Sequence, residues 1–392
     1  MVLELDILQS LGIAIIAYIL GVSIKNKSKF LTRFFIPSPA IGGILISILV
    51  LILSKTGLAE ISFDKILQDF FMNIFFATIG LACSFRILKK SGWLGLKLSL
   101  AIIILLPLQT LIAIGLCHVF DINPMLGVAM GSTSMTGGIG SAVSFGKIME
   151  ASGATNATAI GVASASFGLL AGSLLGGPVA NRLIDRYNLE SAGQMKTQDL
   201  EDHPKTMNQQ TLMQAIIVTA MACFVGTFIN KLLALTDLSF PYYVGLQFAG
   251  ILVRNLMEAF GMKLDMYNID TIGNISLNLF LSLALISLNI GAIVALALPM
   301  VVIMGAQAAL IALYTSFVTY RLGGGDYDAA VMVAGHCGVG LGQTPNAMAN
   351  MEAIIEQKGP ADLAMFVFPI VLAIAVNLFN PLFITLFFNI LK

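Results

Sequence analysis

Long apolar runs recur through this 392-residue chain and constrain its fold more than any other feature. A run of about 20 apolar residues matches a helix that crosses the hydrocarbon core of a membrane. Because that core offers no water to unpaired backbone groups, only helices and closed barrels cross it. The chain is 57% hydrophobic and 11% charged, whereas a soluble domain carries about 25% charged residues. The sequence therefore predicts an all-α polytopic membrane protein.

We predict five spanning helices in each half of the chain. They cover about residues 7–24, 39–54, 68–85, 93–118, 157–181, 211–233, 240–257, 272–290, 293–320 and 362–388. A short amphipathic piece, 55–67, follows the second span. Residues 187–210 are charged and lack apolar periodicity, which is typical of a solvated linker. This divides the chain into a first repeat (1–186), a cytoplasmic linker (187–210) and a second repeat (211–392).

Two stretches rich in Gly, Ser, Thr and Asn interrupt the apolar pattern, at about 125–155 and 329–357. Non-helical backbone survives at membrane depth only where protein buries it or where it lines a wet cavity. Matching interruptions in two halves of a chain indicate the binding site of a transporter. We therefore expect each stretch to form a re-entrant helical hairpin.

The two halves repeat at a nearly constant offset. Pro37 corresponds to Pro241 (241−37 = 204), and Gly138-Ile-Gly140 corresponds to Gly340-Leu-Gly342 (340−138 = 202). Because each half has an odd number of predicted spans, the second half enters the membrane upside down. This is the inverted-repeat plan of many secondary transporters.

Basic residues predict the orientation. If the segment 25–33 is cytoplasmic, sixteen of the 21 Lys and Arg residues fall on the cytoplasmic side. The positive-inside rule then puts both termini outside and the linker inside. This arrangement requires the hairpin at 125–155 to enter from outside and the hairpin at 329–357 to enter from inside. No basic n-region precedes the first apolar run, so we interpret this run as a span and not as a cleaved signal.

The hairpin tips carry the candidate binding groups. Hydroxyl, amide and free carbonyl oxygens suit Na⁺, and helix N-termini attract anions. We expect Na⁺ near the tips, without assigning individual ligands. Close packing of small residues is the structural alternative. The predicted substrate- and ion-binding residues are Ser132, Thr133, Ser134, Thr136, Gly137, Gly138, Gly140, Gly338, Gly340, Gly342, Gln343, Thr344 and Asn346.

Other polar residues near the hairpins are further candidates, with Asp328 and His336 in gating or capping. Asp328 is expected to cap the second hairpin or to line a cation path, and His336 to hydrogen-bond within the tip. Lys147 either snorkels to the interface or clamps a substrate carboxylate. Glu150 and Glu352 hold equivalent places in the halves, as solvated end-caps or as functional intramembrane carboxylates.

Several other classes are disfavoured. The net charge of zero gives no reason to expect nucleic acid. The four cysteines form no C-x-x-C pair, so neither a metal cluster nor a disulfide framework is expected. His336 and Cys337 lack the further ligands that zinc needs. Asp326 and Asp328 match short signatures of intramembrane aspartyl proteases, but both lie in one turn, so we expect no enzyme and no cofactor.

Several motifs carry a family resemblance. They are PSPAIGG (37–43), FFATIGL (75–81), FGLLAGSLLGGPVA (167–180) and YDAAVMVAGHCGVGLGQTPNAMANM (327–351). In these motifs the chain resembles the bacterial sodium/glutamate symporter family. The resemblance implies Na⁺-driven glutamate uptake across the bacterial cytoplasmic (inner) membrane by a homodimer that works as an elevator. The chain departs from the family pattern at Ile139, Ala142 and Gln343, in the tips.

The sequence thus predicts a secondary active transporter that couples Na⁺ to the uptake of L-glutamate by an elevator mechanism. Its expected partners are a small anionic amino acid, Na⁺ and the lipid bilayer. The first alternative is a Na⁺- or H⁺-coupled symporter of another amino acid or carboxylate. The alternative from a different class is an ion channel or a non-transporting membrane receptor.

Overall fold

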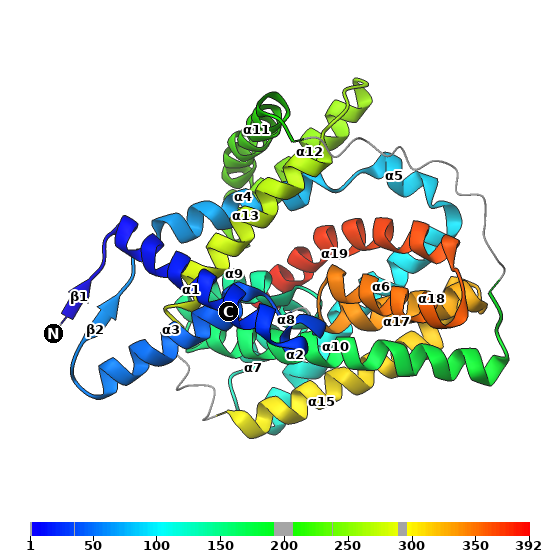
Figure 1. Ribbon diagram of the computed structural model, residues 1–392, viewed down its shortest axis with the longest axis horizontal. Helices are drawn as coiled ribbons and strands as arrows, with labels where there is room; N and C mark the ends of the chain where they lie inside the picture. The colour runs from blue at the N-terminus through cyan, green and yellow to red at the C-terminus, as the bar shows by residue number, and fades with distance from the viewer. Residues whose placement is uncertain (1, 35, 192–206, 237, 289–295) are drawn as a thin grey trace.

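The computed structural model describes residues 2–34, 36–191, 207–236, 238–288 and 296–392, and these are nearly all helical (Figure 1). The helices of the first half are α1 (Ile7–Lys27), α2 (Lys29–Arg33), α3 (Ser38–Lys55), α4 (Ile66–Leu81), α5 (Phe85–Lys90), α6 (Gly92–Val119), α7 (Pro124–Met130), α8 (Ser132–Met135), α9 (Gly138–Ala151) and α10 (Ala157–Tyr187). Those of the second half are α11 (Gln209–Leu233), α12 (Tyr242–Ala259), α13 (Met266–Leu285), α15 (Ala297–Tyr314), the π-helical turn η1 (Thr315–Thr319), α16 (Tyr320–Gly323), α17 (Tyr327–Leu341), α18 (Thr344–Lys358) and α19 (Asp362–Leu391).

A short strand pair corrects the all-α prediction. β1 (Val2–Glu4) pairs in parallel with β2 (Glu60–Ser62), which lies in the piece predicted as amphipathic, 55–67. The Asp64 backbone N–H also donates to Ser10 Oγ at 2.9 Å. Three-residue strands are too short to show a periodicity of two, so the pairing depends on tertiary contact and no sequence pattern predicted it.

Eight described helical segments are long and apolar enough to cross a membrane. They are Ile7–Lys27, Ser38–Lys55, Ile66–Lys90, Gly92–Val119, Ala157–Tyr187, Gln209–Leu233, Ala297–Gly323 and Asp362–Leu391. The chain therefore has the architecture of a multi-pass membrane protein.

Two of the ten predicted spans do not meet this measure. The predicted spans 240–257 and 272–290 correspond to α12 and α13, which are more polar than the eight. α12 carries Arg254 and Glu258, and α13 carries Asp270. Residues 289–290 of one predicted span, 293–295 of the next and 192–206 of the predicted linker lie outside the described residues.

Local signals set where the helices begin. Asp6 caps α1 by accepting the Gln9 N–H at 2.8 Å, and the Gln9 side chain accepts the Asp6 N–H in return, which forms a capping box. Pro37 and Pro241 stand at equivalent places, each immediately before a helix, α3 and α12. Asn123 caps α7, which opens the first hairpin.

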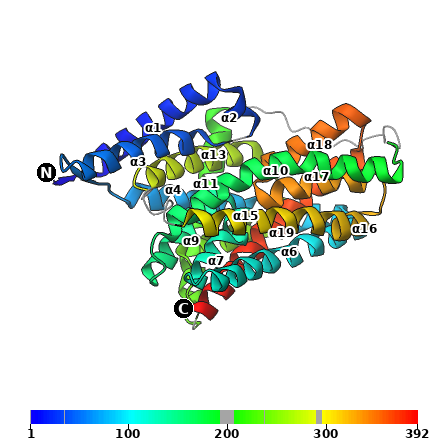
Figure 2. The same ribbon diagram turned by 90° about the horizontal axis from the view of Figure 1, so that it is seen from below.

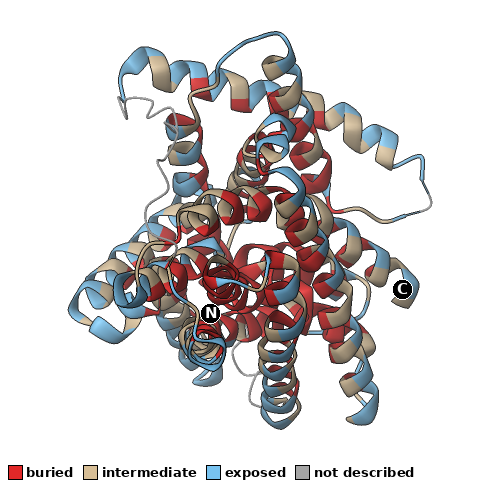
Figure 3. Ribbon diagram, turned by 90° about the vertical axis from the view of Figure 1, so that its right-hand side faces the viewer, coloured by how far each residue is buried: buried red, intermediate tan, exposed pale blue. Residues whose placement is uncertain are grey.

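The helices pack as two bodies. We call α6–α10 and α15–α19 the hairpin body, and α1, α3, α4 and α11–α13 the flanking body, because packing is densest within each group. Figure 2 shows α10 and α15 side by side along the hairpin body. The bodies meet where α13 contacts α9 and where α4 contacts α19. Buried residues concentrate in the interior of the hairpin body (Figure 3).

Both predicted hairpin stretches form pairs of packed helices. α17 and α18 have 15 residues each, which gives a length of about 22 Å, shorter than the roughly 30 Å core of a bilayer. Every residue of α17 except Asp328 is buried. α10 packs against both hairpins. At Gly168 of α10 a Cβ would overlap the Leu341 carbonyl oxygen, so this close crossing needs glycine.

Candidate functional site

The two hairpin tips meet inside the hairpin body. The first tip, 131–137, lies between α7 and α9 and contains the single turn α8, and the second tip, 340–343, comprises the end of α17 and the turn Gly342-Gln343. Gly138 has a φ of +66°, and a Cβ there would lie 2.6 Å from Gln343 Nε2. The first tip therefore turns against the Gln343 side chain, and Gly138 is suited to this position by its left-handed backbone and its small size.

Gln109 of α6 connects the two tips. Its Nε2 donates to the Gly340 carbonyl oxygen at 2.5 Å, and its Oε1 accepts the Thr136 hydroxyl at 2.7 Å. Gln109 is fully buried, and Gln307 of α15 donates to its backbone carbonyl at 2.7 Å. Sequence reasoning missed both glutamines. The available signal was an amide side chain in the middle of an apolar run, since polar groups within a membrane segment need a partner.

Further buried side chains hold the first tip. The Ser132 hydroxyl lies 3.0 Å from the Thr110 hydroxyl of α6, and Asn380 of α19 donates to the Ser132 carbonyl oxygen at 3.2 Å.

A contact in the second half matches the one between Thr110 and Ser132. It joins the Thr315 hydroxyl of η1 to Cys337 Sγ of α17, 3.3 Å apart. Both members of this second pair lie 205 residues after their counterparts (315−110 and 337−132).

Asn346 holds the second tip against α10. Its Nδ2 donates to the Leu169 carbonyl oxygen at 2.8 Å and lies 2.9 Å from the Ser173 hydroxyl. The side chain is almost fully buried. Its neighbour at the start of α18, Thr344, is exposed.

Four buried oxygens around the tips lack a hydrogen-bond partner among the described residues. They are Thr133 Oγ1, Gln307 Oε1, Asn346 Oδ1 and Asn380 Oδ1. Leaving such an acceptor buried and unpaired costs about 1–3 kcal/mol, so each favours a ligand. The described residues hold no cluster of His, Cys, Asp or Glu that would suit a transition metal. Neutral oxygens of this kind fit Na⁺, which transporters bind through carbonyl and side-chain oxygens.

Other predicted tip residues have packing or structural roles. Ser134 donates to the carbonyl oxygens of Ala129 and Gly161, the latter at 2.8 Å, and so fixes the tip to α10. Gly338 lets the second hairpin's arms approach, since a Cβ there would lie 2.7 Å from Ala347. Gly140 faces the flanking body, where Phe75 is its nearest neighbour. Gly342 ends α17, and Gly137 precedes α9 in the first tip.

Two predictions need correction. Asp326, not Asp328, caps α17, by accepting the Ala329 N–H at 2.8 Å. Asp328 instead accepts the Ala364 N–H at 2.8 Å and so caps α19. His336 lies in the interior of α17 and not at the tip, with its Nδ1 2.8 Å from the Thr319 hydroxyl.

The remaining charged candidates lie away from the tips. Lys147 of α9 forms an ion pair of 2.7 Å with Asp69 of α4, which neither sequence interpretation anticipated. Glu150 accepts the Thr158 N–H at 2.9 Å and caps the first turn of α10. Glu352 is exposed on α18.

Comparison with known proteins identifies the family. The family profile described as sodium/glutamate symporter matches residues 3–360. The sodium/glutamate symporter of Escherichia coli (strain K12) is 36% identical over 392 residues, 98% of this chain and 98% of its own length. That of Haemophilus influenzae (strain ATCC 51907 / DSM 11121 / KW20 / Rd) is 33% identical over 397 residues, 98% of this chain and 97% of its own. These relatives are named as symporters and not as enzymes, which confirms the prediction of a transporter and not an enzyme. The chain belongs to the sodium/glutamate symporter family.

Proposed function

We propose that this protein couples the inward movement of Na⁺ to the uptake of L-glutamate across a bacterial inner membrane. The observation that carries the proposal is the contact of the two hairpin tips through Gln109, in a chain of this family. A site built from both tips responds to the position of either one. This is what coupling of an ion to a solute requires, since each ligand must bind the same conformations preferentially.

Substrate and ion bind at the tips in this proposal. Thr133 and Asn380, whose oxygens are buried and unpaired at the first tip, are the side chains that we assign to Na⁺. Backbone N–H groups at the start of α18 and the exposed Thr344 hydroxyl receive the substrate carboxylate. Gln343, which departs from the family pattern, lies against Gly138 in the tip contact and therefore bears on the choice of substrate.

Transport in this proposal is a movement of the hairpin body against the flanking body. The dense packing within each body and the limited contact between them support such an elevator step. The similar order of helices in the two halves supports an inverted repeat, with both termini outside and the linker in the cytoplasm. The homodimer implied by the family resemblance stays a prediction.

Uptake into proteoliposomes tests the proposal. Purified protein is reconstituted, and accumulation of radiolabelled L-glutamate is measured with an inward Na⁺ gradient, with equal Na⁺ and with choline in its place. We expect accumulation only with the inward gradient. If net positive charge moves inward, a negative interior potential adds about 2.3 kcal/mol per charge per 100 mV. Accumulation that ignores the Na⁺ gradient contradicts Na⁺ coupling.

Competition identifies the cargo. Unlabelled aspartate, succinate and citrate are added in excess to the same assay. L-Glutamate should compete best, and a stronger effect of another carboxylate would assign that compound as the substrate. Uptake that never saturates and never raises the internal glutamate concentration above the external one would instead indicate a channel.

A further inference from the structure

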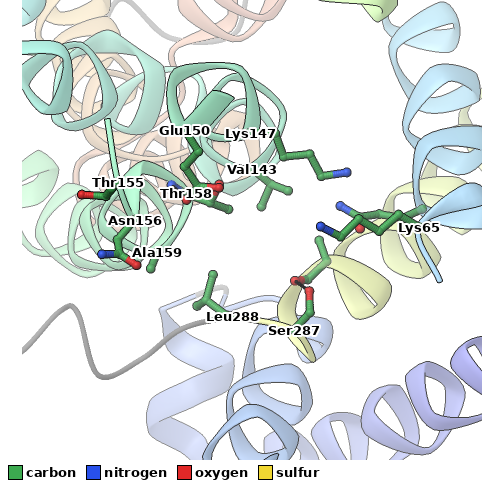
Figure 4. Close-up of a pocket in the computed structure, with 12 residues that line it drawn as sticks. Lys65, Val143, Lys147, Glu150, Thr155, Asn156, Thr158, Ala159, Ser287 and Leu288 are labelled. Atoms are coloured by element: carbon green, nitrogen blue, oxygen red, sulfur yellow. Dashed lines mark hydrogen bonds between the residues drawn. The ribbon is translucent and has the colours of Figure 1, made fainter. Parts of the chain in front are cut away.

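A cavity of about 440 Å³ lies between the hairpin body and the flanking body, away from the tip contact. Val143, Lys147, Glu150 and the loop into α10 form its wall on the hairpin body, and Lys65 and the end of α13 form the opposite wall. Its size falls within the roughly 300–1,000 Å³ of small-molecule sites. In Figure 4, Lys147 and Lys65 extend toward the same side of the cavity from opposite walls.

The charges of this cavity suit an anion. Lys65 is exposed and makes no ion pair with any residue that the structure describes. Glu150, the carboxylate in the lining, already accepts the Thr158 N–H. Asp69, which lies outside the lining, pairs with Lys147. An anion in the cavity thus meets the Lys65 ammonium group, which has no ion-pair partner among the described residues, and the Lys147 ammonium group, whose partner it can replace, against the one negative charge of Glu150.

The pair of Lys147 with Asp69 joins the two bodies. The pairs Arg254–Glu258 and Lys358–Asp185 each lie within one body, whereas Lys147–Asp69 connects α9 to α4. Its side chains are 28% and 53% exposed, so the pair is hydrated, and such pairs are weak enough to exchange partners readily.

We propose that this cavity is a first binding site for a small carboxylate, which it occupies before it reaches the tips. Lys65 binds the carboxylate, and Lys147 leaves Asp69 to bind it as well. The inference rests on the proposed function, in which the cargo is a carboxylate and both termini lie outside. Because the N-terminal strand β1 pairs with β2, which ends three residues before Lys65, Lys65 lies on that outer side. Arrival of the anion then removes an ion pair between the two bodies before the substrate reaches the tips. The site thus concentrates the anion and removes one contact between the two bodies in the same event.

Transport kinetics test the exchange. The initial rate of glutamate uptake is measured against glutamate concentration for Lys65→Gln, Lys147→Gln and Asp69→Asn. Removing one of two opposite charges that attract each other through water weakens binding about fivefold. The two lysine variants should therefore raise KM by about this factor. Asp69→Asn should lower KM, because it frees Lys147. Lys147→Arg keeps the positive charge, so its KM should stay near that of the wild type. This result would show that the raised KM of Lys147→Gln does not come from misfolding.

Lys55→Gln is the matched control. Lys55 is exposed at the end of α3 and does not line the cavity, so its KM should be unchanged. Raising ionic strength at fixed Na⁺ should raise the KM of the wild type more than that of Lys65→Gln, since salt screens the lost charge. If the wild type transports but both lysine variants keep its KM, or if Asp69→Asn raises KM as Lys147→Gln does, the inference is wrong.

A second measurement does not depend on transport. Ser287→Cys, in a Cys223→Ser background, places a thiol in the cavity lining for labelling by a maleimide. Glutamate or succinate should slow labelling, and Lys65→Gln should abolish this protection. Protection without uptake would support the cavity and contradict the proposed function. Uptake without protection would contradict the cavity and leave the proposed function standing.

Discussion

Gln109 Nε2 donates a hydrogen bond of 2.5 Å to the carbonyl oxygen of Gly340, which lies 231 residues further along the chain. The same side chain accepts the Thr136 hydroxyl of the other tip. Both tips therefore depend on one buried amide. When one tip moves, Gln109 must move with it or lose a hydrogen bond, and either change affects its bond to the other tip. Gln109 therefore couples the positions of the two tips.

Gln109→Leu should weaken this coupling. The substitution keeps the approximate volume but leaves the Thr136 hydroxyl and the Gly340 carbonyl unpaired, at about 1–3 kcal/mol for each buried group. We expect a lower melting temperature of the purified protein and a changed Na⁺ concentration for half-maximal uptake. Both are measured on the same preparation, by thermal unfolding and by a Na⁺ titration of uptake.

Asn268→Leu is the control for Gln109→Leu. Asn268 of α13 is equally buried and its Nδ2 donates to Asp265 Oδ2 at 2.5 Å, so both partners lie at the start of α13 in the flanking body, away from the tips. It should lower the melting temperature without changing the Na⁺ dependence. An unchanged Na⁺ dependence in Gln109→Leu would refute a coupling role for the bridge.

Gly138→Ala should impair transport more than a comparable glycine substitution elsewhere. Alanine at positive φ costs about 1–2 kcal/mol by backbone strain alone. Gly153→Ala measures that strain in isolation, because Gly153 has a φ of +97° and nothing lies within 4 Å of a Cβ there. At Gly138 the Cβ also meets Gln343 Nε2, so Gly138→Ala should lower both stability and uptake beyond Gly153→Ala.

The double variant Gly138→Ala/Gln343→Ala separates the two terms at this tip. Removing the Gln343 side chain relieves the clash but not the backbone strain. Stability should therefore return to the level of Gly153→Ala and not to that of the wild type. If Gly138→Ala alone matches Gly153→Ala in both measurements, the tips are not in tight contact.

The sequence predicted where the hairpins lie but not what joins them. Glycine, serine and threonine in an apolar chain mark the tips, because a stretch rich in such residues does not suit an ordinary lipid-facing helix. Gln109 stands out only as an amide within an apolar run, and nothing in the sequence points to its partners, since Thr136 and Gly340 lie 27 and 231 residues away and no local spacing relates them. The Lys147–Asp69 pair was missed for the same reason, with 78 residues between its members.

Asp326 and Asp328 show how a local rule selects the wrong residue. Asp326 immediately precedes α17 and Asp328 lies in its first turn, so a local rule allows either as the cap, whereas α19, which Asp328 caps, begins only at Asp362. Asp326→Ala and Asp328→Ala should each destabilise the protein by about 1 kcal/mol through loss of a cap. Asp326→Asn and Asp328→Asn, which keep an acceptor oxygen, should stay near the wild type in thermal unfolding. Equal losses in the Ala and Asn variants would show that charge and not capping matters.

Thr133→Val tests the assignment of Na⁺ to the first tip. Thr133 is fully buried, and its hydroxyl has no partner among the described residues, so the isosteric change removes an oxygen without breaking a hydrogen bond to that part of the chain. If this oxygen binds Na⁺, half-maximal uptake should need at least roughly tenfold more Na⁺, because interactions with a charged partner contribute about 1.5–3 kcal/mol.

Ser134→Ala is the matched control for Thr133→Val, one residue away. The Ser134 hydroxyl already donates to the Gly161 carbonyl oxygen, so its removal should lower stability and leave the Na⁺ requirement unchanged. The opposite pattern, a shifted Na⁺ requirement in Ser134→Ala and none in Thr133→Val, would move the ion away from the Thr133 hydroxyl.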